Sequence, residues 1–169
     1  MTLSERWTLA VLTAYDSEHR VRSFLFALLA SLDLGNLGPR KLLNKTAAAR
    51  VSKYLDNYAE DKGIYMKINY VNADHVHALV DLPTAFSIGE LMQLLKGSSS
   101  HWINANDIMT GKFAWGRGYG AFSVSESNVD QVARYIAHQE EHHRMRTFAE
   151  ELRGFIDRHG LQWKEEESR

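Results

Sequence analysis

The sequence predicts an α+β fold, because segments with the two-residue alternation of β-strands are interspersed with segments that have the apolar spacing of amphipathic helices. The chain has 169 residues, of which 44% are hydrophobic, enough for the core of one domain. It contains two prolines and no tract rich in glycine, serine or proline that would act as a linker. We therefore expect a single domain over residues 1–169.

The N-terminal part is predicted to contain strands and a loop. Residues 7–15 favour a short strand, and residues 21–31 are apolar on both faces, which fits a buried strand or a core helix. Periodicity does not separate these two structures, and we favour the strand. Residues 33–39 (DLGNLGP) have the composition of a loop.

A helix and then a hairpin are predicted next. Apolar side chains recur at helical spacing over residues 46–62, and Gly63 follows as a stop signal. Residues 64–71 alternate as a strand, residues 72–74 (NAD) favour a turn, and residues 75–82 form a second strand. The two strands should pair as a hairpin.

A second helix and another strand follow. Ser87 and Glu90 have the spacing of a capping box, which predicts a helix that ends near Gly97 or continues to Ile103. Residues 115–125 are rich in glycine and aromatic residues and then alternate, which favours a strand.

Two helices end the predicted fold. Asn128 is expected to cap a helix that runs to about Arg144, and residues 148–159 form a last amphipathic helix. The order β-α-β-β-α-β-α-α contains the split βαβ arrangement of a ferredoxin-like antiparallel sheet. We expect the helices on one face of this sheet.

Composition limits the kinds of function. The chain has 20 lysines and arginines against 21 aspartates and glutamates, so no global basic field indicates a nucleic-acid or membrane partner. The absence of cysteine excludes disulfides and thiolate metal sites, so histidine or oxygen ligands would hold any metal. No targeting segment is recognised, and no apolar stretch is long enough to span a bilayer. We expect a soluble, cytoplasmic protein.

Two histidines form the first candidate site. His75 and His77 lie on a predicted strand, where alternate side chains share a face. Both imidazoles should point to one side while Val76 enters the core, which makes half of a metal site. The alternative is a pair of solvent-facing histidines, which is the more common meaning of an isolated H-x-H pattern.

A tyrosine and a glutamine form the second candidate site. Tyr135 and Gln139 are four residues apart on a predicted helix and therefore share a face. They fit a phenol nucleophile beside a neutral oxygen ligand. A packed tyrosine ring and a surface glutamine are the more common alternative.

Four segments occur in the order and spacing of one family: residues 74–80 (DHVHALV), 95–104 (LKGSSSHWIN), 118–125 (GYGAFSVS) and 135–143 (YIAHQEEHH). Over about residues 64–159, more than half of its length, the chain resembles the IS200-like transposases. These are single-tyrosine HUH nucleases and include the REP-associated tyrosine transposases. Residues before about 45 match the family poorly.

The resemblance implies a ferredoxin-like fold, a homodimer, and cleavage and rejoining of single-stranded or hairpin DNA assisted by Mg²⁺ or Mn²⁺. His75 and His77 match the paired histidine ligands, Tyr135 matches the nucleophile, and Gln139 matches the third ligand. Attack by Tyr135 on a phosphodiester would give a 5′-phosphotyrosine and a free 3′-hydroxyl. An apolar stripe in the last predicted helix is a candidate dimer contact: Phe148, Leu152, Phe155 and Ile156.

Candidate DNA-binding residues are basic or aromatic. The clearest basic cluster precedes the first acid of the helix at residues 46–62 and consists of Arg40, Lys41, Lys45, Arg50 and Lys53. Phosphate contact is also a candidate role of Lys96, and base stacking is a candidate role of Trp115, Arg117, Tyr119 and Phe122. Ordinary charged surface and packed aromatic residues are comparably common explanations of such positions.

Two other functions stay open. The chain is a hairpin or single-stranded DNA-binding module if it keeps these residues without turnover. His138, where the family usually has Asn, completes with His142 the pattern H-x-x-E-H of a zinc peptidase. No distal acidic ligand is identifiable, so the peptidase is the weaker alternative.

Overall fold

The computed structural model describes residues 24–32, 43–142, 150, 153–154 and 157. The chain divides into two compact units, residues 1–137 and 138–169, and each is described by itself. The described part of the second unit includes α4 (Gln139–His142). The elements described in the first unit are β1 (Phe24–Leu32), α1 (Lys45–Asp61), β2 (Met66–Val71), β3 (His75–Leu82), α2 (Ile88–Ala105), β4 (Trp115–Ser123), the 3₁₀ turn η1 (Glu126–Asn128) and α3 (Val129–Ala137).

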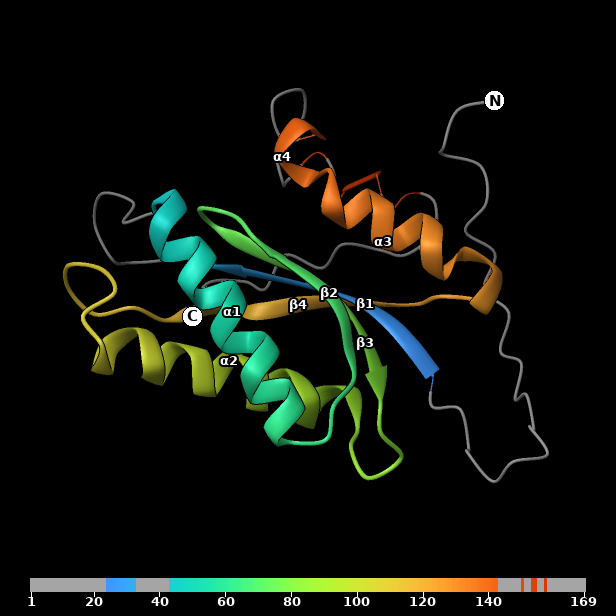
Figure 1. The fold of residues 1–169 in the computed structure, drawn as a ribbon, viewed down its shortest axis with the longest axis horizontal. Helices are drawn as coiled ribbons and strands as arrows, with labels where there is room; N and C mark the ends of the chain where they lie inside the picture. The colour runs from blue at the N-terminus through green and yellow to red at the C-terminus, as the bar shows by residue number, and fades with distance from the viewer. Residues whose placement is uncertain (1–23, 33–42, 143–149, 151–152, 155–156, 158–169) are drawn as a thin grey trace. The chain divides into compact units, whose positions relative to one another are not determined.

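The four strands of the first unit form one antiparallel sheet in the order β2-β3-β1-β4 (Figure 1). This order, with α1 between β1 and β2 and α2 between β3 and β4, is the split βαβ arrangement of a ferredoxin-like fold. The predicted α+β class is therefore confirmed. β3 lies inside the sheet, where His77 is opposite Leu29 of β1 on one side and Tyr70 of β2 on the other.

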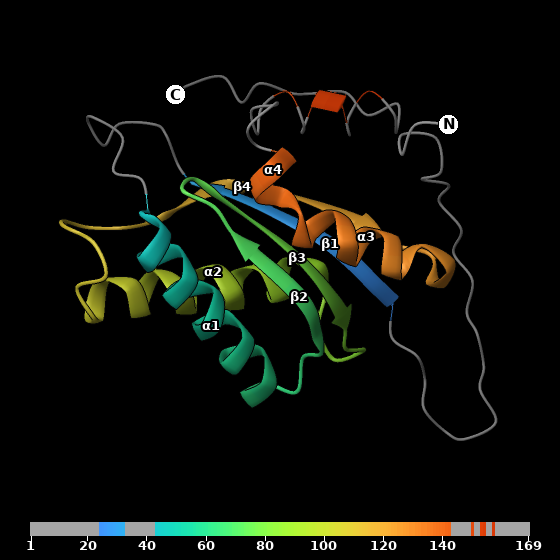
Figure 2. The same ribbon diagram turned by 45° about the horizontal axis from the view of Figure 1, so that its top comes forward.

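Alternate residues of β3 face two different helical layers. Val76, Ala78 and Val80 belong to a buried cluster with α1 and α2, whereas Leu79 belongs to a cluster with α3. Because successive side chains of a strand point to opposite faces, α1 and α2 cover one face of the sheet and α3 lies on the other (Figure 2). The prediction of helices on one face holds for α1 and α2 and does not include α3.

Gly63 ends α1 because it adopts a backbone conformation that other residues avoid. Its φ is +68°, in the left-handed region. The amides of Gly63 and Ile64 donate to the carbonyls of Glu60 (2.9 Å) and Ala59 (2.8 Å). These two hydrogen bonds form a Schellman motif, and Ile64 and Ala59 are both buried. The predicted stop signal is confirmed.

Side chains cap the beginnings of α1 and α2. Asn44 Oδ1 accepts a hydrogen bond from the Ala47 amide (2.8 Å). Ser87 Oγ accepts from the Glu90 amide (3.2 Å), and the Glu90 carboxylate accepts from the Ser87 amide (2.8 Å), so the predicted capping box is confirmed. The hydrogen bonds that the amide and the hydroxyl of Ser87 donate to the Glu90 carboxylate lower the pKa of this carboxyl. α2 continues to Ala105, so the longer of its two predicted ends is correct.

The helix predicted over residues 128–144 is interrupted. Asn128 ends the 3₁₀ turn η1, directly before α3, so its role as a cap stays a prediction, and a turn at His138 separates α3 from α4. The Glu141 amide donates to the His138 carbonyl three residues earlier (3.1 Å), which is tighter than the four-residue spacing of an α-helix. Tyr135 and Gln139 therefore lie on different helices.

The predicted strand at residues 7–15, the loop at residues 33–39 and the apolar stripe of the last helix lie outside the described residues. The homodimer and the single domain over residues 1–169 stay predictions. Within the described ranges, no helix has both the length and the apolar character that a membrane crossing requires.

We predict that Gly63→Ala lowers the free energy of unfolding by about 1 kcal/mol, because the left-handed conformation costs a residue with a Cβ about 1–2 kcal/mol. Space is not the cause, since a Cβ at Gly63 meets nothing within 4 Å. Gly97→Ala is the matched control: it lies inside α2, is equally open, and should raise the free energy of unfolding by about 0.5–1 kcal/mol. Urea denaturation of the full chain measures both, and equal effects of the two variants would contradict the assignment.

Candidate functional site

His75 and His77 lie on the face of β3 opposite the α1 and α2 layer. Their exposed fractions are 1% and 3%, and their ring centroids lie 4.9 Å apart with 81° between the ring planes. Val76 between them packs into the cluster with α1 and α2. Both imidazoles therefore share one face, as predicted, and the alternative of solvent-facing histidines is wrong. Burial of two imidazoles is unfavourable unless their ring nitrogens form hydrogen bonds or bind a metal ion.

Asp74, directly before β3, orients His75. Its Oδ1 lies 2.6 Å from Nδ1 of His75. An ionised carboxylate only accepts hydrogen bonds, so this contact assigns the proton to Nδ1 and leaves the lone pair on Nε2. Carboxylates commonly orient metal-binding imidazoles in this way. Asp74 is absent from the predicted site residues, and the signal that would identify it is an acid directly before the H-x-H strand.

Tyr135 of α3 lies on the same face of the sheet as the two histidines. It packs against the buried cluster that contains Leu79, two residues after His77 on β3, and Tyr70 of β2 packs against the same cluster. Tyr70 is the cross-strand partner of His77, and side chains at such positions share a face with Cβ atoms about 4.5–5.5 Å apart. Tyr70 therefore connects the cluster around Tyr135 to the histidine pair.

Gln139 begins α4 in the second unit, and its exposed fraction is 0%. A fully buried glutamine is uncommon, because its amide needs hydrogen bonds or a ligand role to offset the loss of water. The two units are not placed relative to one another, so the convergence of Gln139 on His75 and His77 stays a prediction.

The donor set suits a divalent cation that accepts both nitrogen and oxygen ligands. Among the described residues, no group of three His, Cys, Asp or Glu side chains can hold a metal ion. Within this part of the chain, a metal ion on His75 and His77 would take its other ligands from groups of another kind, such as an amide, water or phosphate oxygen. Two imidazoles fit Mn²⁺ better than Mg²⁺, which strongly favours oxygen ligands.

Three predicted DNA-binding residues line one groove. Lys45, Arg50 and Lys53 of α1 border an open groove of about 720 Å³ together with Tyr54 and Trp102. It lies on the face of the sheet that α1 and α2 cover. The two aromatic residues are absent from the predicted set, although both occur where the sequence indicates a helix.

Lys96 and Tyr119 line a second groove, of about 370 Å³, between α2 and β4. Nζ of Lys96 donates to the Gly116 carbonyl of β4, and Tyr119 has an exposed fraction of 47%. Contact of either residue with DNA stays a prediction. The side chain of Arg117, and all of Arg40 and Lys41, lie outside what the structure describes.

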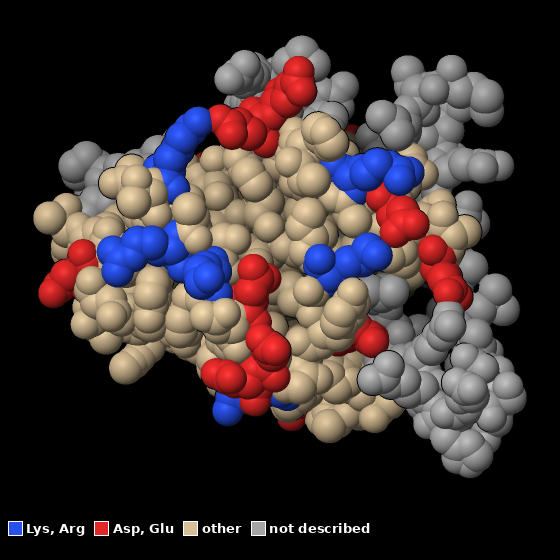
Figure 3. All heavy atoms as spheres, viewed as in Figure 1, with Lys and Arg blue, Asp and Glu red and all other residues tan. Residues whose placement is uncertain are grey.

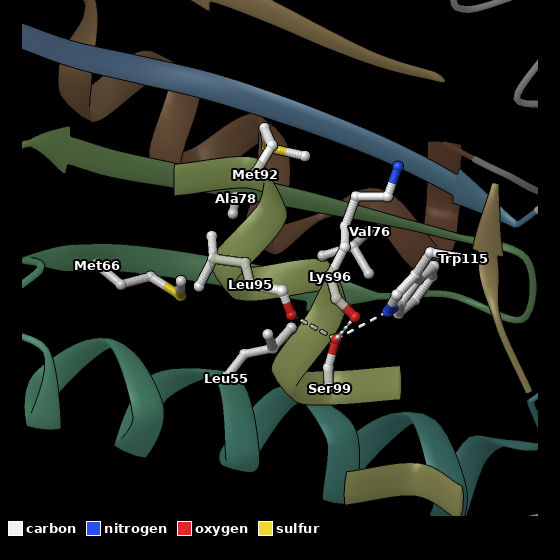
Figure 4. A pocket seen from close by; sticks show the side chains of 9 residues that line it. All are labelled: Leu55, Met66, Val76, Ala78, Met92, Leu95, Lys96, Ser99 and Trp115. Carbon is white, nitrogen blue, oxygen red and sulfur yellow. Dashed lines mark hydrogen bonds between the residues drawn. The ribbon is translucent and has the colours of Figure 1, made fainter. Parts of the chain in front are cut away.

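Trp115 is a core residue, so of its two predicted roles the structure selects packing over base stacking. Its exposed fraction is 8%, and its Nε1 donates to Ser99 Oγ (2.7 Å), which donates to the Leu95 carbonyl (2.6 Å) (Figure 4). The ring borders a mainly apolar cavity of about 30 Å³, room for little more than a water molecule. Trp115 and Ser99 therefore join β4 to α2.

The zinc-peptidase alternative stays a hypothesis. His138 is exposed and lies in the turn directly before α4, and the side chain of His142 lies outside what the structure describes.

Comparison with known proteins identifies a family by sequence. The family model described as "Transposase IS200 like" matches residues 39–139. This range includes His75, His77, Tyr135 and Gln139. No curated protein matches the chain.

Two solved structures have a similar fold. A transposase candidate from Deinococcus radiodurans R1 is 21% identical with a TM-score of 0.54, and the match covers 75% of this chain and 98% of that one. A REP-associated tyrosine transposase bound to a REP hairpin is 13% identical with a TM-score of 0.54, and the match covers 78% of this chain and 74% of that one. At these identities the likeness concerns the fold alone.

Proposed function

Because the chain belongs to the IS200-like transposase family, we propose that it cleaves and rejoins single-stranded DNA through a covalent bond to Tyr135. The observation that carries this proposal is the position of Tyr135 on the sheet face from which His75 and His77 project. This shared face supports the proposal, because phosphoryl transfer depends on the positioning of the nucleophile and the metal ligands, here the proposed nucleophile Tyr135 and the proposed ligands His75 and His77.

The proposed step conserves the energy of the phosphodiester bond. Oη of Tyr135 attacks the phosphorus atom, and the bond from phosphorus to the 3′ oxygen breaks. The phenol releases its proton to solvent as the new bond forms, and the departing 3′ oxygen gains a proton from solvent. The products are a 5′-phosphotyrosine and a free 3′-hydroxyl. Attack by another 3′-hydroxyl on this phosphotyrosine reverses the step and joins a new strand without a nucleotide cofactor.

His75, His77 and Gln139 are the proposed ligands of Mn²⁺ or Mg²⁺. When bound, such a cation polarises the scissile phosphate and neutralises the charge that develops on it. All three ligands are neutral, so they leave the positive charge of the ion undiminished. Asp74 keeps the His75 ring in one orientation, with the proton on Nδ1.

The proposed substrate is a DNA hairpin with a single-stranded flank. One structural relative is a REP-associated tyrosine transposase bound to a REP hairpin, and the family resemblance extends this class of substrate to the present chain. Assembly as a homodimer is proposed on the same resemblance. Light scattering of the full chain, with and without hairpin DNA, tests it, and a monomer in both samples would count against it.

We predict that Tyr135→Phe abolishes covalent capture of DNA, because it removes the attacking oxygen and keeps the ring. The stability of the variant should stay within about 1 kcal/mol of the original, since the ring volume is preserved. The assay incubates the full chain and Mn²⁺ with a pool of labelled hairpins that have randomised flanks. A denaturing gel then detects protein-linked DNA.

Tyr70→Phe is the matched control for this assay. Tyr70 packs against the same cluster as Tyr135 and is the strand partner of His77. The Tyr70→Phe variant therefore also loses a phenol hydroxyl close to the site, but it should still form the covalent adduct with DNA. Loss of the adduct in Tyr70→Phe and its retention in Tyr135→Phe would mean that Tyr70, and not Tyr135, is the nucleophile. DNA binding without any adduct in the original chain would favour the non-catalytic DNA-binding module.

We predict that Asp74→Ala weakens Mn²⁺ binding about 10–100-fold, the usual effect of losing a carboxylate that orients a ligand histidine. His77→Ala should reduce Mn²⁺ binding further, because it removes a ligand. Paramagnetic resonance of free Mn²⁺ measures this binding without requiring activity. Asp61→Ala is the control, since Asp61 lies at the end of α1 on the other face of the sheet. Equal Mn²⁺ affinities of the Asp74→Ala and Asp61→Ala variants would refute the orienting role.

A further inference from the structure

Lys67 of β2 is the additional residue of a β-bulge. Met66 is opposite Val80 of β3. Ile68, two residues further along β2, is opposite Leu79, which is only one residue away from Val80 on β3. Two steps along β2 therefore match one step along β3, and Lys67 is the residue that the bulge inserts.

The neighbours of Lys67 do not need the bulge to reach their places in the core. Met66 packs against the cluster with α1 and α2, and Ile68 packs against the cluster with α3. Successive residues of a regular strand already face opposite layers, so a strand without Lys67 would place both side chains as they are. The inserted residue contributes its own side chain and a local bend, and bulges commonly redirect a side chain in this way beside active sites.

The side chain of Lys67 forms an ion pair with α3. Its Nζ lies 3.2 Å from Oδ1 of Asp130, which belongs to the first turn of that helix. The exposed fractions of the two side chains are 31% and 77%, so solvent screens the pair only in part. Figure 3 shows both basic and acidic atoms at the surface over α3. The pair joins β2, at one edge of the sheet, to the helix that carries Tyr135.

α3 depends on its contacts for its place on the sheet. It has nine residues, and an isolated helix shorter than about 12–15 residues is marginal in water. Its buried residues form one apolar stripe against the cluster of Leu79: Val129, Val132 and Ile136. The hydrophobic effect is non-directional, so this stripe selects the buried side of α3 without tying the helix to one point on β2. The ion pair supplies a directional contact at the start of the helix.

The position of the first turn determines the position of Tyr135. Tyr135 follows Asp130 by five residues, which is about 7.5 Å along an α-helix. A shift of the first turn therefore moves the phenol together with the rest of this short helix. Because reaction requires the attacking atom about 3–3.5 Å from its target, a displacement of about 1 Å slows it strongly. A contact that adds little to the stability of the fold can thus affect the rate of attack.

We propose that Lys67 is a positioning residue, which holds the first turn of α3 through Asp130 and thereby keeps Tyr135 in place for attack on DNA. This role rests on the proposed function, which makes Tyr135 the nucleophile. A lysine on an edge strand also hinders pairing with another chain, and an acid in the first turn of a helix also suits the helix dipole. Neither of these effects requires the two side chains to act together, whereas positioning does.

The test is a double-mutant cycle of Lys67→Gln, Asp130→Asn and the variant with both changes. Single-turnover formation of the adduct, with Mn²⁺ and a saturating hairpin that the original chain captures, measures attack separately from binding. Each single change should lower this rate about threefold, as expected for a partly exposed ion pair, and both together should lower it no further. Single effects that multiply in the double variant would mean that the two residues act separately, and would refute the proposal.

Two further variants separate position from charge. Lys67→Arg keeps a cation at the bulge and should restore the rate of attack. Lys62→Gln removes an equal charge at the end of α1, where Nζ lies 5.7 Å from the Tyr58 centroid, and should leave the rate unchanged. A loss in Lys62→Gln equal to that in Lys67→Gln would reduce the effect to net charge and contradict positioning.

Fluorescence anisotropy with the same hairpin measures DNA affinity, which Lys67→Gln should retain. Weaker binding of this variant combined with an unchanged rate of attack would make Lys67 a phosphate contact, and the proposal would fail.

Hydrogen exchange of the full chain without DNA tests the contact independently of cleavage. The amides of α3 should exchange about threefold faster in Lys67→Gln and in Asp130→Asn, because the helix opens more often, whereas the amides of α1 should keep their rates. Unchanged exchange in α3 would show that the pair does not hold the helix. An equal increase in α1 would indicate a general loss of stability and would likewise count against positioning.

Failure of the proposed function and failure of this inference give different results. If the original chain forms no adduct, the proposed function is contradicted, and the exchange of α3 alone decides whether Lys67 holds the helix. If the original chain and all variants form the adduct at equal rates, the proposed function stands and the positioning role of Lys67 is wrong.

Discussion

The rest of the structure depends on the burial of β3 on both of its faces. Every residue of β3 from His75 to Val80 is buried, and alternate side chains enter different helical layers. A shift of one residue in the register would exchange the two sets, placing both imidazoles in the apolar layer with α1 and α2. The same apolar packing that selects the register of Val76, Ala78 and Val80 therefore places His75 and His77.

Burying this polar pair is unfavourable, and the surrounding structure offsets the penalty. Asp74 accepts the hydrogen bond of one imidazole, and the two neighbours of β3, β1 and β2, satisfy its backbone. The apolar residues that alternate with the histidines contribute the hydrophobic free energy that keeps the strand in place. Buried side chains have few accessible rotamers, so the site is preorganised before any ligand binds.

The sequence predicts the elements from residue 43 to residue 123 well, because their signals are local. The capping box at Ser87 and the left-handed Gly63 involve residues only a few positions apart, and the alternation of β3 is visible in its own residues. The turn at His138 has no such signal, because the helical pattern continues through it. The roles of Tyr70 and Trp102 depend on long-range partners, the strand opposite His77 and the ring of Tyr54. Periodicity along one element does not reveal such contacts.

A sheet with helices on both faces separates two layers that make opposite demands on side chains. The face with the histidines is closed to solvent, so its residues are buried and few substitutions fit there. The cations of α1 are exposed, so a substitution there changes the surface charge and leaves the packing of the core intact. A change at Arg50 or Lys53 leaves the register of β3 untouched, because the core beneath α1 consists of other residues, such as Val51 and Leu55. The surface charge of α1 and the geometry of the histidine pair can therefore change independently on this fold.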